Sequence, residues 1–426
     1  MKTKSHDLIL PGLLLLFLAL QVTAWAQAFK EPDANCCRTL RVVLYPFLPA
    51  HGDYFFQVQH DFEAANPRVK LQILDLSANY YDPKKADYVG ASVADVYELD
   101  SILLADFISQ NRIQPLPQKI PIRSQDYLKN AQSAATWGTV WYGVPHWVCG
   151  YFLFFRSDDP NADKLRNVKD LAGLEKIVGA NHQVGEGVLV DMMGKLSLGE
   201  MYLAAAFDRY SDWDHVRPHL QPDQNPEEEI ESDLWRLSRL SDANFGRSSR
   251  YHYADGFYGR QFAHGHGRLL VGYSEGLSPL LDEEKNACQS NECMNSAMID
   301  VAALPLDDHA LHPISWVDLL TIDKNCTGDK LNDAIAFIDF INREDEMLKA
   351  LMPDNNTSRS ARYLLPAKAS LYANTNLLNA APLYPKLRGI IEDSFPPVGT
   401  NMNATLRIYG ATVDSFLSAT NKSPRP

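Results

Sequence analysis

Short apolar runs alternate with amphipathic helical stretches along much of this chain, and this alternation limits the folds that it can adopt. The predicted strands are residues 40–44, 69–74, 94–97, 269–273, 299–304 and 314–322. The predicted helices are residues 54–65, 101–110, 331–341 and 346–352. Such an alternation is typical of an α/β protein with a mainly parallel sheet, in which ligands gather at the carboxyl ends of strands.

The first 28 residues have the pattern of a secretory signal peptide. A short basic head precedes an apolar core at residues 8–22, and small residues suit cleavage near Ala26 or Ala28. An uncleaved membrane anchor is the alternative, but the core is short and no basic flank follows it. We therefore expect a secreted or periplasmic protein of about 400 residues that keeps no stable membrane anchor.

The chain is acidic, and its negative charge disfavours negatively charged partners. The formal net charge is −13, and removal of Lys2, Lys4 and Asp7 with the signal peptide takes away a net +1 and leaves −14. An acidic protein repels nucleic acid and anionic membranes and tolerates a cationic ligand better. No phosphate-binding loop or glycine-rich strand–helix turn indicates a nucleotide, and no cofactor is predicted.

Six cysteines remain after the signal peptide, and an oxidising compartment favours their pairing. Cys288 and Cys293 frame the polar loop CQSNEC and are predicted partners. Cys326 lies in another polar loop and has Cys36 or Cys37 as its candidate partner. No CxxC or HxxxH spacing accompanies these residues, so no metal site is predicted.

Cys149 differs from the other thiols because it stands in an apolar, aromatic segment, YGVPHWVCGYFLFFR. A Cys in such surroundings is usually a packing residue, which is the alternative to a reactive role. Its place at the end of a predicted strand also suits a nucleophile, and Tyr45 and Asp100 fall near other strand ends. His146, three residues earlier, would point to the opposite face of an extended strand and is not interpreted as an activating base.

The order of elements resembles the type II periplasmic-binding-protein architecture, in which two lobes enclose a central cleft. The resemblance implies a first lobe at residues 29–155, returning at about 318–368. It implies a second lobe at residues 156–317, returning at about 369–426. Fold alone would indicate a solute receptor.

Three sequence blocks resemble thiaminase I, the thiamine pyridinylase family: DVYELDSILLADFI, YGVPHWVCG and VGYSEGLS. The resemblance implies that Cys149 is the nucleophile, Glu275 the catalytic acid–base group and Asp100 a substrate contact. Tyr45, Tyr273 and Asp318 are expected in the cleft from their positions in this architecture. Tyr251, Tyr253 and Tyr258 are further cleft candidates, and the sequence does not decide among them.

The family resemblance also implies a reaction and its partners. The thiolate adds to the thiamine pyrimidine, thiazole leaves, and the pyrimidine passes to an amine, a pyridine-type base or another nucleophile such as a thiol. A secreted monomer without cofactor or metal is expected. Two alternatives stay open: a non-catalytic receptor for thiamine or a sugar, and a secreted Cys hydrolase, which needs a His within reach of Cys149.

Overall fold

The structure, a computed structural model, describes residues 37–85, 88–179, 187–241, 247, 252, 256–287, 293–354 and 357–420. The predicted signal peptide lies outside these ranges, as do Cys36, Cys288, Tyr251 and Tyr253. Within the described ranges, no helix combines the length and apolar character that a bilayer crossing requires.

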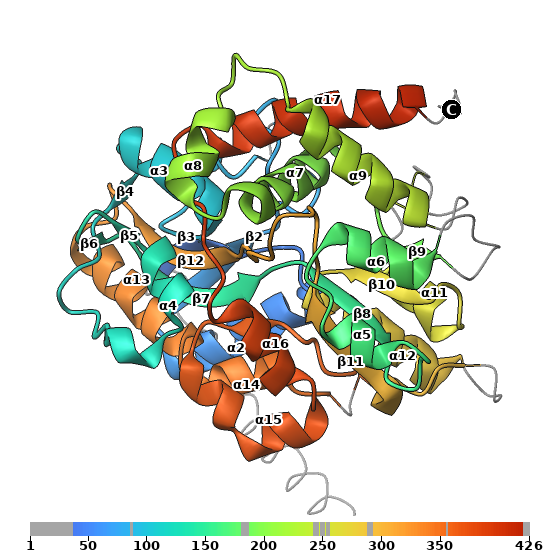
Figure 1. Cartoon of the computed structure of the whole chain (residues 1–426). Coiled ribbons are helices and arrows are strands. Elements are labelled where there is room, and N and C mark those ends of the chain that lie inside the picture. Colours follow the sequence, from blue (N-terminus) through green and yellow to red (C-terminus); the bar gives the residue numbers. More distant parts are fainter. Residues whose placement is uncertain are drawn as a thin grey trace, which may run out of the picture.

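Two β-sheets organise the described part of the chain (Figure 1). The larger sheet has the order β13-β7-β12-β3-β1-β2, with β4 paired to β12. Its strands are β1 (Arg38–Val43), β2 (Val69–Leu74), β3 (Val96–Asp100), β4 (Ile113–Gln114), β7 (Gly143–Cys149), β12 (Trp316–Asp323) and β13 (Leu365–Pro366). The smaller sheet has the order β11-β8-β10-β9, formed by β8 (Phe152–Arg156), β9 (Val188–Leu189), β10 (Leu269–Gly272) and β11 (Ile299–Ala303). A separate hairpin joins β5 (Thr136–Trp137) to β6 (Val140–Trp141).

The predicted mainly parallel sheet is wrong for much of the molecule. Strand β1 pairs in parallel with β2 and β3, but β12 runs antiparallel to β3, β4 and β7. The physical reason is that β12 brings the chain back from the smaller sheet and inserts between β3 and β7 in the opposite direction. Periodicity reports which face of a strand is buried and carries no information about the direction of its neighbour.

Helices cover both sheets (Figure 1). Those that precede the smaller sheet or lie within its connections are α2 (His51–Ala65), α3 (Ser101–Ser109), α4 (Lys129–Ala134), α5 (Ala162–Arg166), α6 (Leu171–Val178), α7 (Lys195–Tyr210), α8 (Trp213–Val216), α9 (Glu228–Leu240), α11 (Phe257–Ala263) and α12 (Leu277–Asn286). Those that follow are α13 (Gly328–Ile341), α14 (Glu344–Leu351), α15 (Thr375–Ala380), α16 (Tyr384–Ile391) and α17 (Met402–Thr420). Short 3₁₀ turns are η1 (Ser124–Asp126), η2 (Arg217–His219), η3 (Ser274–Gly276), η4 (Ser296–Met298) and η5 (Ala369–Ala373).

The C-terminal helix α17 lies along α7, and Figure 1 shows the pair crossing the top of the molecule. Glycines make this close approach possible. A Cβ at Gly199 of α7 would stand 2.0 Å from the Leu406 carbonyl oxygen, and one at Gly410 of α17 would stand 1.7 Å from the Lys195 carbonyl oxygen. Neither position can hold a larger residue without separating the helices.

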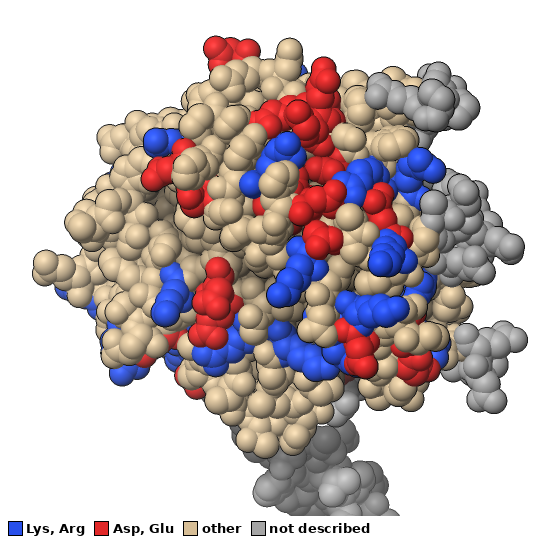
Figure 2. Space-filling view, viewed as in Figure 1, with Lys and Arg blue, Asp and Glu red and all other residues tan. Residues whose placement is uncertain are grey.

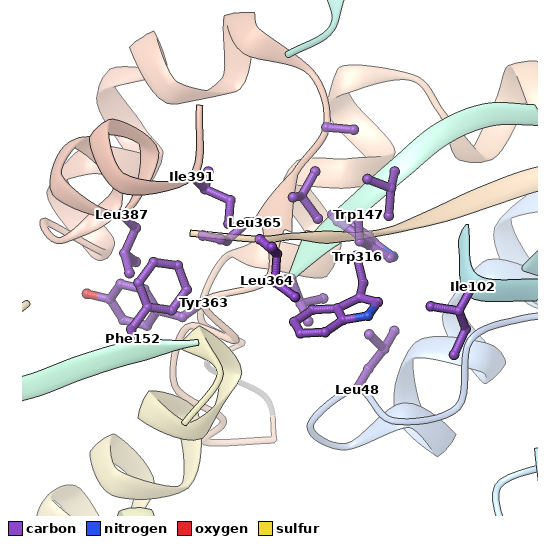
Figure 3. Packing of buried hydrophobic residues seen from close by; sticks show 14 of the residues in the cluster. Leu48, Ile102, Trp147, Phe152, Trp316, Tyr363, Leu364, Leu365, Leu387 and Ile391 are labelled. Carbon is purple, nitrogen blue, oxygen red and sulfur yellow. The ribbon is translucent and has the colours of Figure 1, made fainter. Parts of the chain in front are cut away.

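The chain passes between the sheets at two places that lie close to the core. It leaves the larger sheet at Cys149 and enters the smaller one at Phe152, and it returns between β11 and β12. Trp147 and Trp316 of the two crossing strands are buried, and Figure 3 shows Trp316 beside Leu364. This packing holds the strand ends in place. The predicted lobe boundaries near residues 155, 317 and 368 stay predictions.

The cysteines follow the prediction only in part. Cys149 is a free thiol, as expected. Cys293 is disulfide-bonded, and its predicted partner Cys288 lies outside the described residues, so that pairing stays a prediction. The suggestion that Cys326 pairs with Cys36 or Cys37 is wrong, because Cys326 and Cys37 are both free and Cys326 is fully buried in the core. Burial makes a Cys an apolar packing residue without need of a partner.

Candidate active site

One large cavity, of about 1080 Å³, collects most of the residues singled out from the sequence. Cys149, Glu275, Asp100, Tyr45 and Tyr273 all line it, although they come from segments far apart in the chain. The cavity lies at strand ends of both sheets, because Asp100 and Cys149 end β3 and β7 of the larger sheet and Tyr273 directly follows β10 of the smaller one. The predicted strand-end residues therefore do lie together.

Cys149 is the last residue of β7 and pairs with Trp316 of β12 in the antiparallel register. Its side chain is partly exposed, toward the cavity that it lines. Burial raises the pKa of the Cys149 thiol well above its ordinary value, and the nearby carboxylates of Glu275 and Asp100 raise it further. The thiol is consequently protonated near neutral pH, so a nucleophilic role requires a proton acceptor.

Glu275 lies in η3, the turn that directly follows β10. Burial raises the pKa of its carboxyl to about 7. The Ser274 hydroxyl donates a long hydrogen bond of 3.5 Å to Glu275 Oε2. A carboxyl with a pKa near 7 is well suited to take a proton and return it near neutral pH.

Asp100 ends β3 and also begins α3. Its Oδ1 accepts the Ile102 backbone N–H at 3.0 Å, which makes it the N-cap of the helix. Its Oδ2 accepts the Tyr81 hydroxyl at 2.6 Å. Burial raises the pKa of Asp100 to about 6, so this carboxyl is largely ionised at neutral pH. A structural and a ligand-binding role are therefore compatible in this residue.

Asp318 does not line the cavity wall but lies behind it, 1% exposed, in β12. Burial raises the pKa of Asp318 well above its ordinary value, and the charge of Asp100 raises it further. Its Oδ2 is buried without a hydrogen-bond partner among the described residues. A buried carboxyl in these conditions keeps its proton, and Asp318 is a neutral neighbour of Asp100.

Aromatic side chains form the wall of the cavity on the side of the larger sheet. Tyr45 makes edge contacts with Phe47 and Tyr80, with ring centroids 5.4 and 6.0 Å apart. Phe47 stacks on Tyr81 at 5.7 Å with an interplanar angle of 8°. The sequence indicated Tyr45 alone, because the other three rings stand in loops without a periodic pattern. This wall suits a flat ring, and ring faces also attract cations.

The opposite wall contains residues that were not predicted. Glu200 of α7 is 7% exposed, and its Oε2 accepts the Tyr273 hydroxyl at 2.8 Å. Tyr273 stacks at 4.7 Å on Tyr151, which does not itself line the cavity, and both rings contact Trp316 edge-on. Burial raises the pKa of Glu200 to about 8. The one signal in the sequence was a charged residue within the apolar run of α7, EMYLAAAF.

The remaining candidates lie elsewhere or are engaged differently. His146 does not line the cavity; its Nδ1 lies 2.5 Å from Glu98 Oε1, and both side chains are fully buried. Tyr258 is partly buried in α11 and is absent from the cavity wall. His252 does line the cavity, where its Nδ1 lies 2.7 Å from Asp191. The expectation that His146 is not the base agrees with its contact to Glu98.

A second cavity, of about 630 Å³, is bordered by α9 and differs in its electrostatics. Arginines pair with several of its acids: Arg236 pairs with Asp233 at 2.8 Å, and Arg209 pairs with Asp307 at 3.1 Å. Figure 2 shows acidic side chains gathered near α9 with basic side chains directly beside them. The large cavity is different, because Asp100 and Glu200 are hydrogen-bonded to tyrosine hydroxyls.

Comparison with known proteins finds similarity to thiaminase I. Residues 150–290 match the Thiaminase-1 domain family. Thiaminase-1 from Paenibacillus thiaminolyticus is 27% identical over 395 residues, which cover 89% of this chain and 88% of that protein. The match includes the turn that carries Glu275 and begins directly after Cys149.

Solved structures agree in fold. Clostridium botulinum thiaminase I in complex with thiamin has a TM-score of 0.74 at 23% identity, covering 89% of this chain and all of that one. An ABC-transporter solute-binding protein from Agrobacterium vitis with bound D-mannitol has a TM-score of 0.59 at 16% identity, covering 89% and 93%. The predicted two-lobed α/β fold of the type II periplasmic-binding-protein kind is confirmed.

Proposed function

Since the chain carries a Thiaminase-1 domain at residues 150–290 and has the thiaminase I fold, we propose that it is a thiamine-degrading transferase. The proposal states that the pyrimidine of thiamine is transferred to a second nucleophile, an amine, a pyridine-type base or a thiol. The observation that carries it is the free thiol of Cys149 in a large cavity, among carboxyl groups whose pKa values differ from one another. A receptor has no need for this combination.

In this proposal the Cys149 thiolate adds to the electron-poor pyrimidine ring of thiamine. The bond from the bridging methylene to the thiazolium nitrogen then breaks, and thiazole leaves as a neutral base with the bonding electrons. The incoming nucleophile forms a new bond to the methylene carbon, and Cys149 is expelled as the ring regains its aromatic electrons. Covalent catalysis of this kind divides one difficult substitution into easier steps.

Glu275 serves the proton transfers of both halves. It first accepts the Cys149 proton, which the raised pKa of that thiol makes necessary. It releases this proton to the solvent once the thiazole has left. It then accepts the proton of the incoming nucleophile and returns it to the expelled Cys149 thiolate, so that one proton is released to the solvent in each turnover. Its own pKa of about 7 allows it to alternate between the two forms at little cost near neutral pH.

The acids and aromatic rings of the cavity suit the charge of the substrate. An ionised Asp100 attracts the thiazolium cation, and the walls that contain Tyr45 and Tyr273 offer faces for flat rings. The positive charge of a bound thiamine opposes the effect of the acids on Cys149 and lowers the pKa of its thiol. The substrate thereby helps to activate the nucleophile.

The competing function is a receptor for thiamine or a sugar, and it is supported by the likeness to the mannitol-bound solute-binding protein. The test is incubation of the secreted protein with thiamine and an added aromatic amine, followed by mass spectrometry. We expect the amine conjugate of the pyrimidine and free thiazole. Thiamine that is bound and recovered unchanged with every amine supplied favours the receptor instead.

A parallel incubation with peptide and amide substrates tests the third possibility, a Cys hydrolase. Hydrolysis of these substrates, together with no transfer of the thiamine pyrimidine in the first experiment, would support it. The protein is expected to act as a secreted monomer without a cofactor. Recovery of the protein from the culture medium tests secretion, and gel filtration tests the monomeric state.

A further inference from the structure

A fully buried polar pair lies behind the cavity and takes no part in the proposed chemistry. Glu98 of β3 and His146 of β7 are both 0% exposed, and His146 Nδ1 lies 2.5 Å from Glu98 Oε1. At this distance the two atoms are joined by a hydrogen bond. Glu98 stands two residues before Asp100, and His146 stands three residues before Cys149. The pair therefore joins the two strands that deliver these cavity residues.

The local backbone directs His146 to this contact. The register between β7 and β12 shifts between Asp318 and Leu319, which pair with Trp147 and Pro145 and leave His146 without an opposite residue. Such a bulge turns the side chain of the extra residue away from its regular direction. The His146 carbonyl accepts the Ala367 N–H at 2.9 Å, which fixes the bulge on the other side.

The second oxygen of Glu98 connects the pair to the aromatic wall. Glu98 Oε2 accepts the backbone N–H of Tyr45 at 2.8 Å. The backbone carbonyl of Glu98 accepts the Tyr80 hydroxyl at 2.6 Å. Tyr45 and Tyr80 both line the cavity and contact each other edge-on. One carboxylate-bearing residue thus holds two rings of the wall, and His146 holds the carboxylate.

We propose that Glu98 and His146 are positioning residues of the active site, which together orient Tyr45 and Tyr80 for the flat substrate. The inference rests on the proposed function, since it assigns the pair a role in thiamine binding. A buried polar pair adds little stability compared with an apolar pair of the same size, so its contribution is orientation. Neither residue touches the reacting atoms, and the effect is on substrate binding rather than on the chemical step.

The test compares His146→Phe with His146→Asn. Phenylalanine keeps a ring and removes the donor, whereas the asparagine amide places an N–H near the position of Nδ1. In His146→Phe we expect the KM for thiamine to rise about tenfold, the loss typical of one charge-assisted hydrogen bond. We expect kcat to stay within about twofold of the wild-type value, because Cys149 and Glu275 are not held by the pair. His146→Asn should recover most of the KM.

A second readout does not depend on thiamine. Hydrogen–deuterium exchange of the Tyr45 amide, which donates to Glu98, should become about tenfold faster in His146→Phe and recover in His146→Asn. The control is Asn342→Ala, which removes a buried hydrogen bond of 2.7 Å to the Tyr127 hydroxyl away from the cavity. This variant should lose stability and keep the wild-type KM and Tyr45 exchange.

The outcomes separate the two proposals. A wild-type protein that does not consume thiamine refutes the proposed function, and Tyr45 exchange then still decides whether the pair holds the wall. If the wild-type protein consumes thiamine, two results for His146→Phe overturn the positioning role: an unchanged KM, or a reduction of kcat alone. If His146→Phe does not fold, Glu98→Leu replaces it, because leucine has a similar size and removes both acceptor oxygens. An unchanged KM in that variant also overturns the inference.

Discussion

Asp318 of β12 lies directly opposite Asp100 of β3 in the antiparallel register of the larger sheet. Two buried carboxyl groups placed this close do not both ionise, because each disfavours the charge of the other. The pKa of Asp318 is raised well above its ordinary value, while Asp100 has a pKa of about 6 and keeps hydrogen bonds from Tyr81 and Ile102. One negative charge therefore faces the cavity from this edge.

This relationship predicts the effect of Asp100→Asn. We expect the Kd for thiamine to rise about tenfold or more, because the variant removes a charge near the thiazolium cation. Asparagine also caps helices well, so the stability of α3 should change little. Calorimetric titration measures the affinity. The matched control is Asp170→Asn at the N-cap of α6, where the side chain accepts the Gly173 N–H outside the cavity and thiamine affinity should not change.

Cys149→Ser separates binding from turnover. A serine hydroxyl is similar in size but a far weaker nucleophile, and Glu275 cannot ionise it to the same extent. We expect thiamine consumption to fall below detection while the Kd for thiamine changes by less than about threefold. Loss of thiamine followed by chromatography gives the first value, and calorimetry gives the second. Residual turnover close to the wild-type rate would remove Cys149 from the mechanism.

Glu275→Gln should reduce kcat by about 10² to 10⁴ and leave thiamine binding nearly intact. The pH dependence gives a second test. A base acts in its ionised form, so wild-type activity should fall as the pH drops below about 7, the pKa of Glu275. The residual activity of Glu275→Gln should lack this acidic limb. If the acidic limb persists unchanged in Glu275→Gln, another group is responsible for it.

Glu200 makes the stability of the protein depend on pH. Burial raises the pKa of Glu200 from an ordinary 4.5 to about 8, so the folded protein binds a proton that the unfolded chain releases at lower pH. The free energy of unfolding therefore decreases as the pH rises from about 4.5 to 8. Glu200→Gln removes this dependence and should raise Tm more at pH 8 than at pH 5, as measured by thermal unfolding. The exposed Glu229→Gln should show no such difference, and an equal gain at both pH values would contradict the prediction.

The thiols give a chemical test of the compartment. Peptide mapping without reduction should recover Cys288 linked to Cys293, since the described Cys293 is disulfide-bonded. Alkylation of the folded protein should label Cys149 before Cys326, because Cys149 faces the cavity and Cys326 is fully buried. A disulfide that contains Cys149 would exclude it as the nucleophile.

Local pattern was sufficient for much of the site. Cys149, Asp100 and Glu275 could be found because each follows or ends an apolar strand inside a recognisable block of sequence. Tyr45 and Tyr273 also reach the cavity as expected. Glu200 was missed, since a buried acid in a helix has no local pattern that assigns it to a cavity.

The sequence by itself determined the principal strands, four of the helices and the polar residues at strand ends, because side-chain periodicity and turn chemistry act over a few residues. Only the tertiary structure decided that β12 runs antiparallel between β3 and β7, and with it that Asp318 faces Asp100. It also decided that a bulge turns His146 to Glu98. Strand direction, register and bulges arise from pairing between segments that are distant in the sequence, and β7 and β12 are more than 150 residues apart. No local preference of the chain carries that information.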